Sequence, residues 1–355
     1  MPTITESMLN ELNDNIMKVF DERYFGLSKN TPEFKLFSQA QRLINLSDFK
    51  ELVYDDKPYL ISTQNQHYLD KTVPENATDA CVILGSGDTV FELANRNVKN
   101  IVAIDKNNLQ ELVFWLRYAS MLTLSHKDFC SFLIESNNHK FMSSDVFDTV
   151  KDGFTEDSQI ELKTWELLFR FNPRECFQEQ LFKNVGGNPK TVIKTFPYLE
   201  SKPTYYETRD KLEKINLDIK IISILDYFIA NPDKKFDYID ITNILLFVYQ
   251  YECKNDKNEF KKIRTILKEI FKQNLNYEGV LVLDYFFGLD FDDLNEEKIK
   301  HADFPLVNTI YKSTSELLQE SFELETFQLN KQIPGFGPNQ DRILLTRKKY
   351  NNIDL

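Results

Sequence analysis

Two glycines and two acids stand at a spacing that suits the binding of a nucleoside. Gly85 and Gly87 follow an apolar run, Asp88 comes directly after them, and a second apolar run ends on Asp105. Glycines permit a tight turn and a close approach of backbone to a ligand. An acid about twenty residues further on is the usual acceptor for both ribose hydroxyls. We therefore expect a nucleoside site here, with a plain strand-to-helix turn and a helix N-cap at Asp105 as the alternatives.

The residues around the glycines indicate which nucleoside. A dinucleotide-binding turn would carry a third glycine where this chain has Val90, so part of the usual pyrophosphate cradle is missing. Asp88 would repel a phosphate at the start of the helix, whereas it suits an ammonium or sulfonium group. These two features favour S-adenosylmethionine over NAD or ATP.

Composition limits the classes of protein that fit. The chain has 355 residues, of which 42% are hydrophobic, and its net charge is -12. We therefore expect an ordered protein that does not bind nucleic acid. The four cysteines have no zinc-ligand spacing, the N-terminus does not resemble a signal peptide, and no long apolar run could span a membrane. A cytoplasmic protein with no metal site is the expectation.

The elements that must position these residues alternate between strand and helix. Helices are expected at 89–97, 108–124 and 243–254. Strands are expected at 80–86, 100–105, 139–148, 235–242, 275–288, 322–330 and 341–349. The alternation predicts βαβ units and a mostly parallel sheet, and the last two strands predict a C-terminal antiparallel hairpin. The fold class is thus α/β and Rossmann-like, with helices on both faces of the sheet.

Three parts of the chain are distinguished by their patterns. Residues 1–75 form a predicted helical extension, and residues 76–350 form the nucleoside-binding domain. Within that domain, residues 155–235 interrupt the alternation and are expected to be a helical insertion, because they are too long for one crossover helix.

Several of these motifs resemble one family. The turn Gly85 to Thr89 is similar to its Ser-Gly-Gly-Asp-Asn turn, and Asp105, Asn107 and Gln110 match its Asp-x-Asn-Pro-x-Gln element, although Asn108 replaces the proline. The segments 196–212 and 236–245 resemble two further motifs. The chain thus resembles the DUF3419 family, which includes the 3-amino-3-carboxypropyl transferases of betaine-lipid synthesis.

The resemblance implies a class I methyltransferase-like fold and an unusual reaction. A nucleophile would attack the γ-carbon of the methionine part of S-adenosylmethionine, which leaves methylthioadenosine. The acceptor would be a hydroxyl or amine of a small molecule, lipid or peptide, and contact with a membrane surface is compatible with it. A methyltransferase on the same fold is the first alternative, and a non-catalytic cofactor-binding or interaction protein is the second.

The candidate cofactor residues extend from the turn to later strand ends. They are Gly85, Ser86, Gly87, Asp88, Asp105, Lys106, Asn107, Gln110, Asp145 and Thr242. Asn107 and Gln110 are expected either to position the adenosine or to cap a helix and face solvent. Asp145 is expected either to contact the adenine or to lie in a solvated turn.

The candidate catalytic residues are Asp240, Tyr205 and Asn243. Asp240 interrupts an apolar strand, so it is a candidate general base, with a hydrated strand end as the alternative. Tyr205 could line an acceptor pocket or pack in the core, and Asn243 could bind a ligand or cap a helix. His67 is the histidine placed to reach the site.

Overall fold

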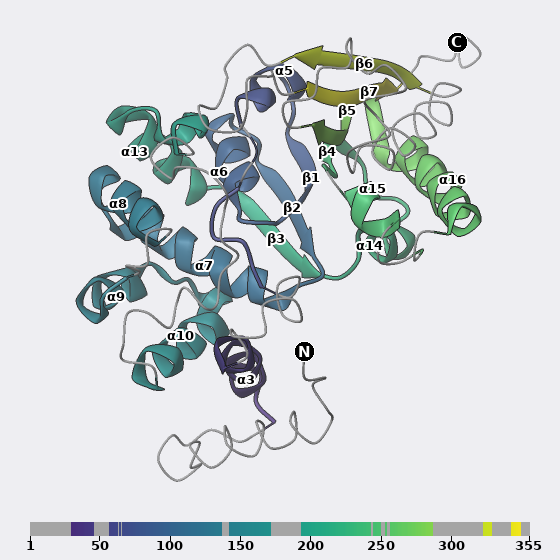
Figure 1. The fold of residues 1–355 in the computed structure, drawn as a ribbon. Helices are drawn as coiled ribbons and strands as arrows, with labels where there is room; N and C mark the ends of the chain where they lie inside the picture. The colour runs from purple at the N-terminus through teal and green to yellow at the C-terminus, as the bar shows by residue number, and fades with distance from the viewer. Residues whose placement is uncertain are drawn as a thin grey trace, which may run out of the picture. The chain divides into compact units, whose positions relative to one another are not determined.

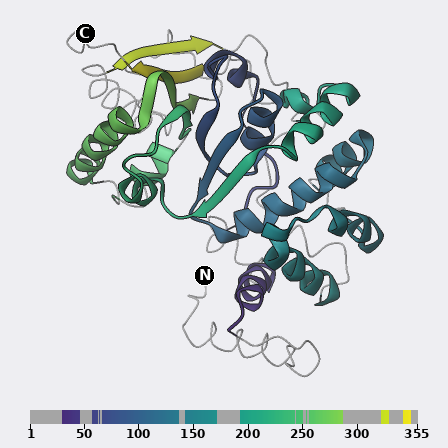
Figure 2. The same cartoon turned by 180° about the vertical axis from the view of Figure 1, so that it is seen from behind.

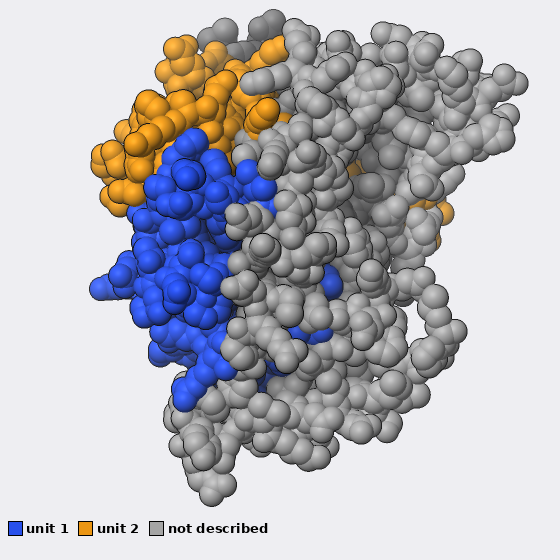
Figure 3. Space-filling view, turned by 60° about the vertical axis from the view of Figure 1, so that its left-hand side comes forward, with its two compact units in different colours: residues 1–63, 85–87, 107–193 blue, residues 64–84, 88–106, 194–355 orange. Residues whose placement is uncertain are grey.

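The computed structural model describes eleven stretches of the chain. They are residues 30–45, 57–62, 64, 66–136, 142–171, 193–242, 244–249, 253, 256–286, 322–328 and 342–348. Residues 1–29 of the predicted helical extension and the candidate residue Asn243 lie outside the described residues. The chain clusters into two compact units (Figure 3). Unit 1 comprises residues 1–63, 85–87 and 107–193, and unit 2 comprises residues 64–84, 88–106 and 194–355.

Unit 2 contains a seven-stranded sheet in the order β3-β2-β1-β4-β5-β7-β6 (Figure 1). The strands are β1 (Asp79–Ile83), β2 (Asn100–Asp105), β3 (Asn216–Ile221), β4 (Phe236–Asp240), β5 (Leu275–Phe286), β6 (Phe322–Gln328) and β7 (Arg342–Lys348). The first five are parallel, whereas β7 pairs antiparallel with both β5 and β6. The predicted class is confirmed: a Rossmann-like, class I methyltransferase-type fold that ends in an antiparallel hairpin.

The helices of unit 2 lie on both sides of this sheet. They are α5 (Leu69–Thr72), α6 (Asp88–Asn95), α13 (Lys202–Leu212), α14 (Ile224–Ala230), α15 (Ile244–Phe247) and α16 (Lys257–Asn274). From β1 the chain adds β2 and β3 toward one edge of the sheet, and then β4 and β5 on the other side of β1. Because crossover connections are right-handed, the helices of the two halves must lie on opposite faces of the sheet. Accordingly, α6 and α13 lie on one side, and α14 and α16 lie on the other (Figures 1 and 2).

The two faces of β4 have different chemistry. Ile239 and Ile241 are buried in a hydrophobic cluster with Phe228 of α14 and Phe271 of α16. Because side chains alternate along a strand, Tyr238 and Asp240 must project from the opposite face. The α14–α16 face is therefore an apolar core, and the face opposite carries a buried acid.

Unit 1 is helical in its described residues. Its helices are α3 (Pro32–Asn45), α7 (Asn108–Thr123), α8 (His126–Ser136), α9 (Ser144–Val150) and α10 (Gln159–Phe171). Most of α7 is buried. Trp165 of α10 donates from its indole Nε1 to the carbonyl of Leu112 in α7 at 2.9 Å. None of the helices described in either unit combines the length and hydropathy needed to cross a bilayer.

The expected third strand at 139–148 is wrong. Residues 144–150 form α9, and the Ser143 hydroxyl caps this helix by accepting from the Val146 N–H at 3.3 Å. The third strand of the sheet is β3, inside the range expected to be a helical insertion. As an edge strand with partly exposed side chains, β3 lacks the continuous apolar run that marks a buried parallel strand.

Candidate functional site at the carboxyl end of the sheet

The order of the strands reverses between β1 and β4. Chain continuity takes β1 to β2 on one side, while β4 pairs with β1 on the other, with Val82 opposite Asp240. On the β2 side, Ile83 pairs with Ile104, so Asp105 lies level with Leu84, the residue before the glycine turn. Ligands of open α/β sheets bind at the carboxyl ends of the strands beside such a reversal.

The glycine turn after β1 has the backbone that the sequence predicts. Gly85 has φ +45° and Gly87 has φ +86°, both in the left-handed region. A Cβ added to Gly87 would lie 2.4 Å from Cδ2 of the buried Phe114 ring, so packing excludes a side chain there. A Cβ added to Gly85 would meet no atom within 4 Å. Gly85 therefore leaves open space beside the backbone, as a bound ligand would require.

Asp240, the last residue of β4, is a buried carboxylate with several hydrogen-bond donors. It is 2% exposed. Its Oδ2 accepts from the hydroxyls of Tyr68 at 2.5 Å and Tyr238 at 3.0 Å, and its Oδ1 accepts from the Thr242 N–H at 3.1 Å. Burial raises the pKa of Asp240, and these donors oppose that rise without cancelling it. The alternative that Asp240 lies at a hydrated strand end is therefore wrong.

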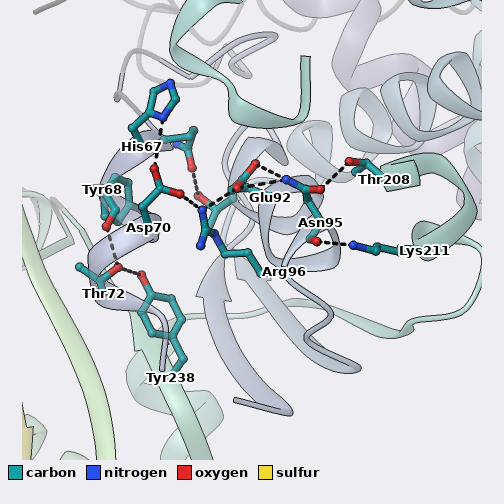
Figure 4. Close-up of polar contacts among 12 residues, drawn as sticks. His67, Tyr68, Asp70, Thr72, Glu92, Asn95, Arg96, Thr208, Lys211 and Tyr238 are labelled. Carbon is teal, nitrogen blue, oxygen red and sulfur yellow. Dashed lines mark hydrogen bonds and ion pairs between the residues drawn. The ribbon is translucent and has the colours of Figure 1, made fainter. Parts of the chain in front are cut away.

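Burial also changes the two phenols. The pKa values of Tyr68 and Tyr238 are raised well above their usual range, first by burial and then by the nearby Asp240. Both tyrosines therefore remain neutral hydrogen-bond donors at ordinary pH. The Tyr238 hydroxyl also contacts Oγ1 of Thr72 at 3.2 Å (Figure 4).

The segment before β1 supplies further side chains to this edge, which the sequence analysis missed. Nε2 of Gln64 donates to Oγ1 of Thr242 at 3.1 Å, and the Thr89 hydroxyl donates to Oε1 of Gln66 at 3.3 Å. Together with Tyr68, every second residue of this segment bonds to a group that follows β1 or belongs to the end of β4. The run Ser62 to His67 is polar at every position, so no local pattern distinguishes Gln64 and Gln66 from their neighbours.

A second buried acid lies in α6. Glu92 is fully buried, and it pairs with Arg96 at 3.1 Å while accepting from Nδ2 of Asn95 at 3.4 Å (Figure 4). Arg96 also binds Asp70, whose other oxygen lies 3.3 Å from Nδ1 of His67. Burial raises the pKa of Glu92 to about 7, against the lowering effect of Arg96. His67 thus faces this ion-pair network.

Asn95 ties the same network to α13. Its side-chain oxygen accepts from the Thr208 hydroxyl at 3.1 Å, and its carbonyl accepts from Nζ of Lys211 at 2.7 Å (Figure 4). These contacts fix the end of α6 through two side chains of α13.

The acids predicted to contact the cofactor have different surroundings. Asp88 is 1% exposed and accepts from the Tyr198 hydroxyl at 2.6 Å. Asp105 is half-buried at the end of β2, and Lys106 is exposed. Asp145 is exposed in the first turn of α9.

The polar residues predicted after β2 have local partners. Asn107 caps α7, because its Oδ1 accepts from the Leu109 N–H at 3.0 Å. Gln110 is buried, accepts from the Tyr59 N–H at 2.8 Å and donates to the Tyr59 carbonyl at 2.7 Å. Both side chains thus support the structure of unit 1, and a role toward adenosine stays a prediction.

Two further predicted residues lie in different surroundings. Tyr205 is buried in α13 and contacts Tyr206 edge-on, with 5.3 Å between ring centroids. Ser86, between the two glycines, directs its carbonyl to the guanidinium of Arg117. Of the candidate residues, the structure brings Asp240 and Thr242 into direct contact.

Comparison with known proteins gives fold-level likeness alone. The sequence matches no protein-family profile and no curated protein. A SAM-dependent methyltransferase from Methanosarcina mazei is 13% identical, with a TM-score of 0.35, over 80% of this chain and 98% of that one. Human N-acetylserotonin methyltransferase in complex with SAM is 10% identical, with a TM-score of 0.33, over 96% and 66%. These values carry no argument about activity, so the DUF3419 resemblance stays a prediction.

The two glycines should respond differently to alanine. Gly87→Ala combines a left-handed φ with a clash against Phe114 and should lower the free energy of unfolding by about 3 kcal/mol or more. Gly85→Ala meets no neighbour and should cost about 1–2 kcal/mol from its backbone alone. Urea unfolding measures both variants, and equal losses would contradict the difference in packing.

Glu92 should make stability depend on pH. Its pKa is about 7 in the folded chain against an ordinary 4.5, so the folded state binds the proton more tightly. The contribution of Glu92 to the free energy of unfolding is therefore fully present below pH 4.5. It is lost as the pH rises to 7, and the loss amounts to roughly 2–3 kcal/mol. The free energy of unfolding is measured for the wild type and for Glu92→Gln at pH 5 and at pH 8. The difference between the two proteins should shift in favour of Glu92→Gln at pH 8.

A matched control for this variant is Glu207→Gln. Glu207 is exposed on α13, and its pKa is lowered by Lys211, so it does not titrate between pH 5 and 8. The control should follow the pH dependence of the wild type. Parallel curves for the wild type and Glu92→Gln would show that Glu92 is already ionised at pH 5.

Proposed function

We propose that the chain is an S-adenosylmethionine-dependent transferase whose cofactor lies at the carboxyl ends of β1 and β2. The observation that carries this proposal is the turn after β1. It has left-handed backbone at Gly85 and open space where a Cβ would be. The turn follows a strand that borders the reversal of strand order, which is where open α/β sheets bind nucleosides.

The residues at this edge fit an adenosyl cofactor. Gly85 would let the backbone approach the ligand without a steric clash. Asp105 is half-buried and level with the residue before the turn, and we propose that its carboxylate accepts from both ribose hydroxyls. The absence of a third glycine at Val90 still disfavours a dinucleotide.

The group that we propose to be transferred is 3-amino-3-carboxypropyl. S-Adenosylmethionine supplies a sulfonium that activates both its γ-carbon and its methyl group toward nucleophiles. Which carbon reacts depends on which one the protein holds in line with the acceptor. The motifs at 85–89 and 105–110 support the γ-carbon, and methyl transfer is the alternative.

Asp240 is the proposed proton acceptor for a hydroxyl or amine of a small molecule, lipid or peptide. Burial raises the pKa of Asp240, which makes its carboxylate a stronger base than that of an exposed aspartate. Its contacts with Tyr68, Tyr238 and Thr242 hold the carboxylate in one orientation. Those contacts would equally suit a protein that binds the cofactor without reacting, which is the second alternative.

The nucleoside product separates the three functions. The protein is incubated with S-adenosylmethionine and a cell extract as the source of acceptor, and the products are identified by mass spectrometry. We expect methylthioadenosine above the level formed without protein. S-Adenosylhomocysteine would establish methyl transfer instead, and the absence of both products alongside measurable cofactor binding would identify a non-catalytic protein.

Two variants of β4 sharpen the same assay. Asp240→Asn should lower product formation by about 100-fold or more, because the proton acceptor is lost while cofactor binding remains. Asp237→Asn removes a hydrogen-bonded carboxylate from the opposite end of the strand, where it accepts from Thr78 and Asn276, and should retain activity. Equal activity in both variants would exclude Asp240 as the base.

A further inference from the structure

Tyr68 and Asp240 form a short hydrogen bond inside unit 2. The phenol oxygen of Tyr68 lies 2.5 Å from Oδ2 of Asp240, whereas the phenol oxygen of Tyr238 lies 3.0 Å from the same atom. A separation of about 2.5–2.7 Å is typical of a hydroxyl that donates to an ionised acceptor. Tyr68 has no exposed surface and Asp240 is 2% exposed, so the bond lies away from water, where such bonds are stronger.

The two phenols reach the same carboxylate oxygen from different parts of the chain. Tyr238 precedes Asp240 by two residues in β4, so it moves together with that strand. Tyr68 ends the 3₁₀ helix η1 (Gln66–Tyr68), which lies before β1 and 172 positions away from Asp240. The contact with Tyr68 therefore fixes the carboxylate relative to a second, independent element.

The segment that carries Tyr68 is itself held on two sides. The Thr72 hydroxyl of α5 lies 3.2 Å from the carbonyl of Tyr68 and 3.2 Å from the phenol oxygen of Tyr238 (Figure 4). Asp70 of the same helix pairs with Arg96 of α6. Contacts to both β4 and α6 thus keep the Tyr68 phenol in place beside Asp240.

We infer that Tyr68 is a positioning residue for the proposed proton acceptor, because its phenol orients the Asp240 carboxylate and favours the ionised form. The inference rests on the proposed function and adds how a buried base is kept ready to take a proton. Burial favours the neutral acid, whereas a hydroxyl that donates to the carboxylate favours the anion. Burial raises the pKa of Asp240, and Tyr68 is the group that opposes this rise most strongly.

Asp240 is the group of this cluster whose charge changes at ordinary pH. Among the described residues, the titratable groups that act on it are Tyr68 from η1 and Tyr238 from β4. Burial and the nearby Asp240 raise the pKa of both phenols well above their usual range. Arg96 of α6 acts on Tyr238, where its effect is smaller than that of burial. A change in the titration of this cluster near neutral pH therefore reports on Asp240.

The charge of Asp240 can be followed by infrared difference spectroscopy, because a protonated carboxyl has a band that a carboxylate lacks. The band that disappears in Asp240→Asn belongs to this residue. We expect Tyr68→Phe to raise the pKa of Asp240 by about one pH unit or more, since a hydrogen bond to a charged acceptor is lost. An unchanged titration of Asp240 would overturn the inference.

The pH profile of product formation separates positioning from support of the fold. The proposed base must be ionised to accept a proton, so activity should fall as the pH drops below the pKa of Asp240. In Tyr68→Phe this acid limb should move to higher pH by the same interval as the titration, and the loss of activity should be greatest at low pH. A tyrosine that supports only the fold would lower activity by the same factor at every pH.

Two further variants replace a phenol by a phenyl ring. Tyr238→Phe removes the longer bond to the same oxygen, so the acid limb should shift in the same direction by a smaller interval. This variant carries the test if Tyr68→Phe does not fold, and the absence of a shift would then overturn the inference. Tyr227→Phe is the matched control, because Tyr227 of α14 is buried in the apolar cluster on the opposite face of the sheet. It should leave the pH profile unchanged.

The outcomes separate this inference from the proposed function. If the wild type forms product and Tyr68→Phe changes neither the titration of Asp240 nor the acid limb, the positioning role is overturned and the proposed function stands. If the wild type forms no product from S-adenosylmethionine, the proposed function fails and the positioning role fails with it.

Discussion

The parallel pairing of β1 with β4 is the constraint on which the rest of the structure depends. It places the buried Asp240 beside Val82, and it makes the carboxyl ends of β1 and β4 the point where strand order reverses. The β1–β2 register then brings Asp105 level with Leu84. The positions of Asp105, Asp240 and the start of the glycine turn therefore depend on how β1 pairs with β2 and with β4.

Burying the Asp240 carboxylate on one face of β4 costs free energy, and specific hydrogen-bond donors compensate for that cost. A buried carboxylate without partners would cost several kcal/mol, and Asp240 has Tyr68, Tyr238 and Thr242 as donors. Glu92 is compensated by Arg96 and Asn95 in the same way. Such networks are strongly destabilised when one partner is lost, so they specify one arrangement of the segment before β1 and of α6.

Local sequence signals predicted the elements around the glycine turn, whereas long-range contacts determined the surroundings of Asp240. The run from β1 through α6 to β2 could be predicted because apolar periods and glycines act over short distances. The strand β3 could not, because its edge position replaces apolar residues with polar ones. The role of Tyr68 depends on a residue 172 positions away, and no local pattern encodes such a contact. Asp240 was found because an acid within an apolar strand is unusual, but its donors were not.

The most direct test of the account is a calorimetric titration with S-adenosylmethionine, performed on the wild type and on Asp105→Ala. The account predicts that the wild type binds the cofactor and that Asp105→Ala binds it about tenfold or more weakly, because two hydrogen bonds from the ribose to a charged acceptor are lost. Equal affinities would remove Asp105 from the ribose site. A wild type that does not bind S-adenosylmethionine would contradict the assignment of the carboxyl edge as a cofactor site.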